Sequence, residues 1–213
     1  MGKPKTDLAP RIREKTLELL LEKEPEEIST RDIAKACGVK ATSLYYYYKD
    51  KESLFTEVKF DCFAEIEVFI SNQVSKKAAK YSRSGKEWNL LLELRTWFEA
   101  FRDWSFANPR VAVLLMGRLK ADTQAEPDKM KKFYRLTDFG KILLDKAVLA
   151  GLSDSKNTLL DVSLCIAAIW GAIESVILNR AAPQYWSPRG GIEFTNKMID
   201  LLMASLMHND RHK

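Results

Sequence analysis

The chain has 213 residues, of which 46% are hydrophobic and 30% are charged, so it can bury a sizeable core and remain soluble. Its formal net charge of +5 suits a polyanionic partner without requiring one. The three cysteines, Cys37, Cys62 and Cys165, are far apart and fit no paired spacing, which predicts neither a disulfide framework nor a zinc site and favours the cytoplasm.

Apolar residues recur at helical spacing almost throughout the chain, and no segment shows the sustained alternation of a half-buried strand. We therefore predict an all-α protein of about nine helices. In chain order, capping residues, glycines and prolines predict helices over about 8–24, 30–38, 41–48, 51–79, 84–107, 109 onward, 127–150, 156–180 and 192–207. Asp50 would cap the fourth of these, and the fifth would start from a capping box of Ser84 and Glu87. A Pro/Gly-rich loop that holds Pro183, Pro188, Gly190 and Gly191 would separate the last two.

Two segments have features relevant to targeting or membrane insertion. Met1–Asp7 carries Lys3 and Lys5 but no apolar run follows, which predicts a short basic arm rather than a signal peptide. Residues 159–178 are mostly apolar and are about long enough to cross a bilayer. They include Asp161 and Glu174, each of which would cost a few kcal/mol inside a membrane, so we interpret this segment as a buried helix.

Residues 29–51, STRDIAKACGVKATSLYYYYKDK, have the parts of two short helices that cross at a tight glycine turn. Ser29 and Asp32 form a capping box, Gly38 supplies the turn, and Leu44 and Tyr48 are the inward face of the second helix. Outward hydroxyls and cations would bond phosphates or base edges, and methyl groups would pack on thymine. The predicted DNA-contacting residues are Thr30, Arg31, Lys40, Ala41, Thr42, Ser43, Tyr45, Tyr46, Tyr47 and Lys51. Tyr45 and Tyr46 could instead be ordinary packing aromatics.

This stretch resembles the DNA-binding domain of the tetracycline-repressor family. The resemblance rests on the opening STRDIA at 29–34, the turn CGV at 37–39, the helix LYYYY at 44–48 and the close KDKE at 49–52. The family usually has Ser where this chain has Lys40, and Lys cannot accept the capping hydrogen bond. Residues 41–43 also differ from the family's usual choice, so no operator sequence can be transferred. The resemblance implies a three-helix DNA-binding domain at 1–51 and a larger helical effector-binding and dimerisation domain at 52–213.

The resemblance further implies a homodimer on double-stranded operator DNA, acting as a repressor that a small hydrophobic or amphipathic effector releases. A stripe of small residues and apolar knobs on the last two predicted helices is the candidate dimer surface, with the chain's own core as the alternative: Ala167, Gly171, Ser175, Leu202 and Leu206. The candidate effector-binding residues are Phe98, Phe101, Met116, Trp170 and Glu174. Most of these aromatics should be packing residues. Glu174 would pair with Arg95, Arg102 or Arg118, or face a ligand.

The sequence shows none of the residue patterns that are typical of an active site. The only histidines are His208 and His212, close to the C-terminus, and we find no glycine-rich phosphate loop, no nucleophile with its base and no metal-ligand spacing. We therefore predict a protein that is not an enzyme and that needs no metal or cofactor. The alternative function is a helical ligand-binding or partner-docking protein without DNA binding, whose sign would be a broken recognition helix.

Overall fold

The computed structural model describes residues 8–118 and 127–207. In these two ranges all regular secondary structure is helical, which confirms the all-α prediction. The nine α-helices are α1 (Leu8–Glu22), α2 (Thr30–Cys37), α3 (Ala41–Leu44), α4 (Lys51–Arg83), α5 (Leu90–Ala107), α6 (Pro109–Val113), α7 (Pro127–Leu149), α8 (Thr158–Ile177) and α9 (Pro188–Leu206). The predicted basic arm, Met1–Asp7, and the two histidines lie outside the described residues.

The contacts divide the chain into two compact units. Unit 1 comprises the described residues of Met1–Ala64 and Arg110–Met130, and unit 2 those of Glu65–Pro109 and Lys131–Lys213. Unit 1 thus extends past residue 51 and takes in a segment from the middle of the chain. The division into a DNA-binding domain at 1–51 and an effector domain at 52–213 therefore stays a prediction about function. The boundaries of the two compact units differ from it.

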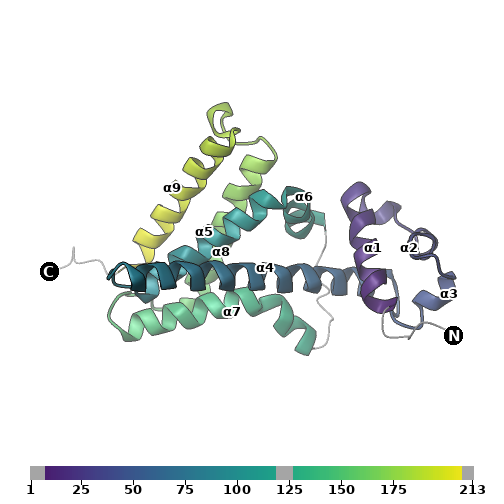
Figure 1. Ribbon diagram of the computed structural model, residues 1–213, viewed down its shortest axis with the longest axis horizontal. Coiled ribbons are helices and arrows are strands. Elements are labelled where there is room, and N and C mark those ends of the chain that lie inside the picture. The colour runs from purple at the N-terminus through teal and green to yellow at the C-terminus, as the bar shows by residue number, and fades with distance from the viewer. Residues whose placement is uncertain (1–7, 119–126, 208–213) are drawn as a thin grey trace. The chain divides into compact units, whose positions relative to one another are not determined.

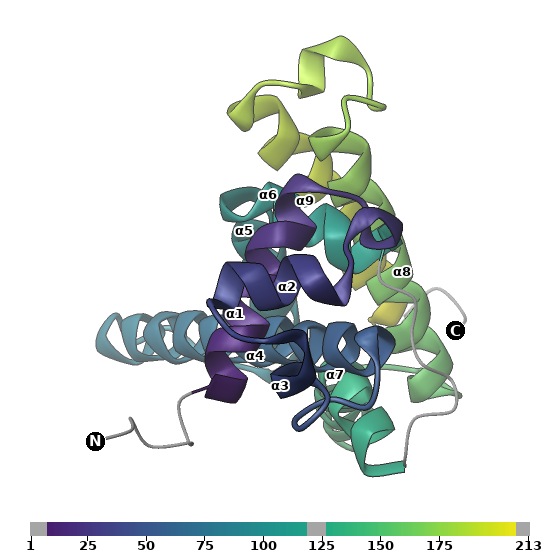
Figure 2. The ribbon, with the colours of Figure 1, turned by 90° about the vertical axis from the view of Figure 1, so that its right-hand side faces the viewer.

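In unit 1, α2 packs against both α1 and α3, and the three short helices lie together at the front of Figure 2. Their shared core holds Ile12 and Leu20 of α1 with Ile33 of α2, each fully buried. Leu44 and Tyr48 contribute to the same core, which confirms the inward face predicted for the second helix of the motif. Phe55 and Val58 of α4, with other residues, complete the core, so the apolar stripes of four helices converge on one interior.

Local hydrogen bonds explain where the helices of unit 1 begin and end. Ser29 caps α2, and the reciprocal bonds between Ser29 and Asp32 form the predicted capping box. Gly38 ends α2 with φ +65°, in the left-handed region that glycine enters without strain. Asp50 accepts from the Ser53 amide at 2.7 Å, while Ser53 Oγ accepts from the Asp50 amide at 3.2 Å, which confirms the predicted cap of α4.

The predicted start of the fifth helix is wrong. Ser84 and Glu87 do not cap it, because α4 continues to Arg83 and Ser84 Oγ donates to the carbonyl of Tyr81 in the last turn of α4. Gly85, with φ +66°, ends that helix, and α5 begins only after Asn89, whose side chain accepts from the Leu92 amide at 2.9 Å. A cluster of Ser and Gly therefore marks a helix end here, not a helix start.

In unit 2, α5, α8 and α9 pack against one another, and Figure 1 shows α8 and α9 joined through a tight corner. The predicted loop between them is present but ends earlier than expected, because Pro188 begins α9 and both Gly190 and Gly191 lie in its first turn. A Cβ on Gly190 would lie 2.8 Å from the Cα of Tyr185, and one on Gly191 would lie 2.7 Å from a methyl of Val176. Glycine is required here for close approach between the corner and the helices.

The three cysteines are free and buried. Burial raises the pKa of the Cys165 thiol to about 11 and also raises the pKa of Cys37, so both stay protonated at neutral pH.

Candidate nucleic-acid interface

The second helix of the motif is shorter than predicted. α3 covers only Ala41–Leu44, and the chain continues to Tyr48 as a looser turn in which the Tyr47 amide bonds to the Leu44 carbonyl at 2.9 Å. Lys40 stands at the N-cap without a side-chain hydrogen bond, as its chemistry predicts. An uncapped start followed by four tyrosines, which are mediocre helix formers, accounts for the short helix.

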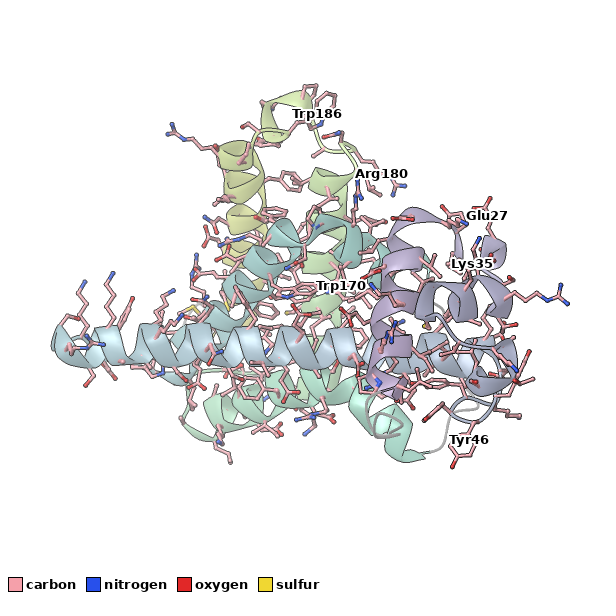
Figure 3. The ribbon with its side chains drawn as sticks, turned by 45° about the vertical axis from the view of Figure 1, so that its right-hand side comes forward. Glu27, Lys35, Tyr46, Trp170, Arg180 and Trp186 are labelled. Atoms are coloured by element: carbon pink, nitrogen blue, oxygen red, sulfur yellow. The ribbon has the colours of Figure 1, made fainter. Side chains whose placement is uncertain are left out.

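The four consecutive tyrosines are sorted by the fold into two groups. Tyr48 is 9% exposed and Tyr47 half-buried at the edge of the core, whereas Tyr45 is 58% and Tyr46 75% exposed. Tyr46 projects from the ribbon into solvent in Figure 3. The packing alternative for Tyr45 and Tyr46 is therefore not supported within a single chain, since unit 1 leaves both rings largely uncovered.

Tyr48 is fixed by polar bonds as well as by packing. Its hydroxyl donates to the Ala9 carbonyl at 3.2 Å and accepts from Arg13 Nη1 at 3.2 Å. Arg13 in turn forms an ion pair with Asp61 of α4, with Nε and Oδ2 2.5 Å apart. Burial raises the pKa of Tyr48 despite the nearby Arg13, so the phenol stays neutral. The motif of residues 29–51 is called the recognition turn below. The network around Tyr48, which the sequence pattern did not reveal, holds the end of this turn against α1 and α4.

The ten predicted DNA-contacting residues fall into two groups of five by exposure. The exposed ones are Arg31, Lys40, Thr42, Tyr45 and Tyr46, and the half-buried ones are Thr30, Ala41, Ser43, Tyr47 and Lys51. The motif brings several of them together. The hydroxyl oxygens of Thr30 and Tyr45 lie 3.5 Å apart across the turn, and the rings of Tyr46 and Tyr47 meet edge to face at 5.1 Å.

Lys51 has a role inside unit 1 that the sequence did not indicate. Its ammonium group donates to the Pro25 carbonyl at 3.0 Å and lies 5.5 Å from the centre of the Phe55 ring. Pro25 opens a short 3₁₀ turn, Pro25–Glu27, before α2. Lys51 thus ties the start of α4 to the approach of α2, and its half-buried state follows from these contacts.

Taken together, the exposed face of the turn carries hydroxyls, cations and phenol rings above an apolar core. Arg31 and Lys40 supply positive charge at the surface, and Thr42 and Tyr46 supply hydrogen-bonding groups. The carboxylate of Asp32, also in the motif, is engaged by the Ser29 side chain and amide, which lower its pKa. Such a surface is chemically suited to phosphate oxygens and base edges.

The predicted effector residues do not form one lined site in a single unit. Phe98 and Phe101 are buried in unit 2, where the Phe101 ring stacks on that of Trp170 at 5.6 Å, so these aromatics pack on one another within the chain. Trp170 lies among the helices in Figure 3. Met116 belongs to unit 1.

Glu174 does not pair with either described arginine that the sequence suggested. Arg95 pairs instead with Asp200 at 2.6 Å and with Glu99 at 3.0 Å, and Arg102 pairs with Asp103 at 2.7 Å. The side chain of Arg118, the third candidate, lies outside the described residues. Glu174 lies 3.7 Å from Arg180, just past the end of α8, and its side chain is one third exposed. Of the two expectations for Glu174, pairing with Arg95 or Arg102 is therefore wrong, and contact with a ligand stays a prediction.

The candidate dimer residues are arranged along the outer side of α8 and along α9. Ala167 and Gly171 are exposed, and the space beyond Gly171 is open. Ser175 is half-buried and its hydroxyl donates to the Gly171 carbonyl at 2.7 Å. On α9, Leu202 is half-buried, whereas Leu206 is only 4% exposed and belongs to the interior of the chain.

The arrangement of a three-helix motif with a solvent-facing second turn, followed by a helical body, defines the class of helix-turn-helix regulators. Residues 12–58 match the family model described as bacterial regulatory proteins, tetR family. The likeness to the tetR family of bacterial regulatory proteins is therefore shown for residues 12–58, which are less than half of the chain. No curated protein sequence matches the chain.

Solved structures extend the likeness of fold over almost the whole chain. A tetR family transcription regulator from Shewanella sp. PV-4 is 17% identical, with a TM-score of 0.74 over 94% of this chain and 98% of that one. A tetR family protein from Vibrio parahaemolyticus is 16% identical, with a TM-score of 0.68 over 95% and 100%. The regulator FadR from Bacillus subtilis, solved in complex with stearoyl-CoA, is 14% identical, with a TM-score of 0.67 over 92% and 98%.

Proposed function

We propose that this protein is a cytoplasmic, sequence-specific DNA-binding transcriptional regulator whose recognition turn reads operator DNA. The observation that carries the proposal is the sorting of the tyrosines, which leaves Tyr45 and Tyr46 exposed while Tyr48 is buried. Both phenol rings are exposed, as are Arg31 and Thr42 of the same motif. Double-stranded DNA fits such a surface, because hydroxyls and cations bond its phosphates and base edges.

The protein acts as a homodimer, because one recognition turn reads only a few base pairs and near-palindromic sites are read by two. The outer side of α8 supports this assignment. Leu160 and Leu164 are 52% and 58% exposed, and with Ala167 and Gly171 they recur at three- and four-residue spacing along one stripe. In the proposed dimer, this stripe contacts the same stripe of a second chain across a two-fold axis. Helix α9 lies at the edge of that contact.

The same stripe explains why α8 is long and apolar enough to cross a membrane by length and composition, with a mean hydropathy of 1.8. Only 28% of that window is buried in a single chain, whereas the sequence predicted a buried helix. A dimer partner covers the remainder in the proposal, so no membrane is involved.

The regulator is a repressor that leaves its operator when a small hydrophobic or amphipathic molecule binds the helical body. Support for this class of effector comes from FadR, which was solved with stearoyl-CoA bound. The candidate contacts remain Phe98, Phe101, Met116, Trp170 and Glu174. For release to occur, the effector must bind the conformation that does not fit the operator more tightly than it binds the DNA-bound conformation.

Selection of binding sites from random duplexes by the purified full chain tests the proposal. We expect enrichment of an inverted repeat with half-sites about one helical turn apart. Selection is done at moderate salt, with and without cell extract as a source of effector, because an effector can favour either the DNA-bound or the released state. Failure to enrich any inverted repeat in both conditions would contradict DNA recognition and favour a helical protein that binds other partners.

A further inference from the structure

A groove of about 620 Å³ lies in unit 2, between the last turns of α4 and the facing side of α5. Four lysines line it: Lys76, Lys77 and Lys80 from α4 and Lys86 from the connection to α5. The facing wall contributes two carboxylates, Glu99 and Asp103, together with Thr96 and Ala100. The volume is within the range of small-molecule sites in proteins.

Both carboxylates of the groove are already neutralised by cations. Glu99 is shared between Lys77, at 2.6 Å, and Arg95, at 3.0 Å. Asp103 is paired with Arg102, whose Nη2 lies 2.7 Å from its carboxylate oxygen. The acids therefore do not cancel the charge of the remaining lysines.

Three ammonium groups of the groove are left without a carboxylate among the described residues. Lys76, Lys80 and Lys86 are exposed and no ion pair joins them to an acid in the part of the chain that the structure describes. Lys76 and Lys80 lie one helical turn apart and so present their charges on the same side of α4. The groove is thus a region of concentrated positive charge with a wall on either side.

The lining also has neutral groups that suit an organic molecule. Tyr81 contributes an aromatic ring, which its edge-to-face contact with Trp88 at 5.5 Å holds in place. Gln73, Thr96 and Ser84 add hydrogen-bonding groups. Lysine ammonium groups bind phosphate as point charges, and several of them set at different heights match a chain of phosphates better than a single carboxylate.

We propose that this groove is a binding site for a small molecule that carries two or more phosphate groups, of the nucleoside polyphosphate kind. Lys76, Lys80 and Lys86 bind the phosphates, and Tyr81 provides a ring surface for the organic part. The site is independent of the recognition turn and of the aromatic interior of unit 2, so it stands whether or not the chain binds DNA.

Cations near a helix C-terminus also stabilise the helix dipole, so the test must separate binding from stability. The test variant is Lys76→Gln with Lys80→Gln, because glutamine removes charge and remains a good helix former. The matched control is Lys146→Gln with Lys156→Gln. These two lysines are exposed in the same unit, Lys146 lies in the last turn of α7, and neither lines the groove.

Binding of inorganic tripolyphosphate and of ATP to the full chain is measured by isothermal titration calorimetry at low ionic strength. We expect saturable binding at one site per chain, weakened at least about tenfold in the groove variant and less than about twofold in the control. Tighter binding of ATP than of tripolyphosphate would support a contribution from Tyr81 to the organic part. Absence of saturable binding, or equal weakening in both variants, would overturn the proposal.

Hydrogen exchange of the wild-type protein gives a second measurement that does not depend on a variant. Tripolyphosphate should slow amide exchange in peptides that cover residues 73–86 and 96–103. Slowing confined to the recognition turn, 29–51, would mean that the phosphates occupy the DNA-binding surface instead, and it would also overturn the proposal.

Discussion

At the scale of single residues, adjacent side chains of one type take opposite roles in this protein. Tyr48 is closed into the core by bonds to Ala9 and Arg13, whereas Tyr46, two residues earlier, is largely open to solvent. The backbone turn between them sets which ring faces the core. The role of each tyrosine therefore depends on its place in the turn, and the two positions should respond differently to loss of the hydroxyl.

Tyr48→Phe should lower the free energy of unfolding by about 1–2 kcal/mol, because the Ala9 carbonyl and the Arg13 guanidinium both lose a hydrogen-bond partner. Urea unfolding followed by circular dichroism measures this change. Tyr46→Phe is the control and should stay within about 0.5 kcal/mol of the wild type. Equal losses in the two variants would show that the network around Tyr48 does not stabilise unit 1.

Lys59 gives unit 1 a dependence on pH. Its side chain is 5% exposed and burial lowers its pKa to about 8, with the ammonium group 5.9 Å from the centre of the Phe63 ring. The unfolded chain holds this proton up to its ordinary pKa of about 10.4, so between about pH 8 and 10 the unfolded state binds more protons than the folded one. This group therefore makes the folded state more stable as the pH rises through that window.

We expect the unfolding free energy of the wild type to rise relative to that of Lys59→Met between pH 7.5 and pH 9.5. Comparison of the two proteins removes the effect of other groups that titrate there, such as tyrosines and cysteines. Urea titrations of both proteins at the two pH values measure the difference. A constant difference across the window would mean that the pKa of Lys59 is not lowered in the folded protein.

At the scale of helices, the sequence predicted those features that depend on near neighbours in the chain. The cap of α2 by Ser29, the left-handed Gly38 and the cap of α4 by Asp50 each involve groups within a few residues, and all three are present. Ser84 was misassigned because a Ser beside a Gly can start or end a helix. Ser84 lies at a helix end because α4 extends as far as Arg83.

Features set by distant contacts could not be predicted. Gly190 and Gly191 suggest a loop in isolation, and only the approach of Tyr185 and Val176 explains why they lie in a helix. Likewise, Lys51 was assigned from its charge alone, and its bond to Pro25 depends on how α4 meets the preceding turn. The aromatic residues proposed for an effector stack on each other, which spacing along a helix does not reveal.

The outer stripe of α8 makes a prediction at the same scale. Leu164→Glu should convert the proposed homodimer to a monomer, because a carboxylate at the centre of the stripe would be buried against its own copy. Sedimentation velocity measures the oligomeric state. Leu149→Glu is the matched control, since Leu149 is 88% exposed at the end of α7 and lies outside the stripe. A dimer that survives Leu164→Glu would place the interface elsewhere.

At the scale of the whole molecule, the chain combines a small tetR-family domain with a helical body whose likeness to solved regulators is one of fold alone. The net charge of +5 contributed little to the assignment, because the charged groups that matter are few and local. What connects the fold to a function is the exposed surface of the recognition turn, since fold by itself does not determine activity.

The most direct test of that connection is a fluorescence anisotropy titration of the selected inverted-repeat duplex with wild type, Tyr46→Ala and Arg31→Ala. Urea unfolding of the same three proteins is measured in parallel. We predict that each variant binds at least about tenfold more weakly, while its unfolding free energy stays within about 0.5 kcal/mol of the wild type. Unchanged DNA affinity in both variants, or weaker binding that only follows a loss of stability, would contradict the assignment of this surface to DNA.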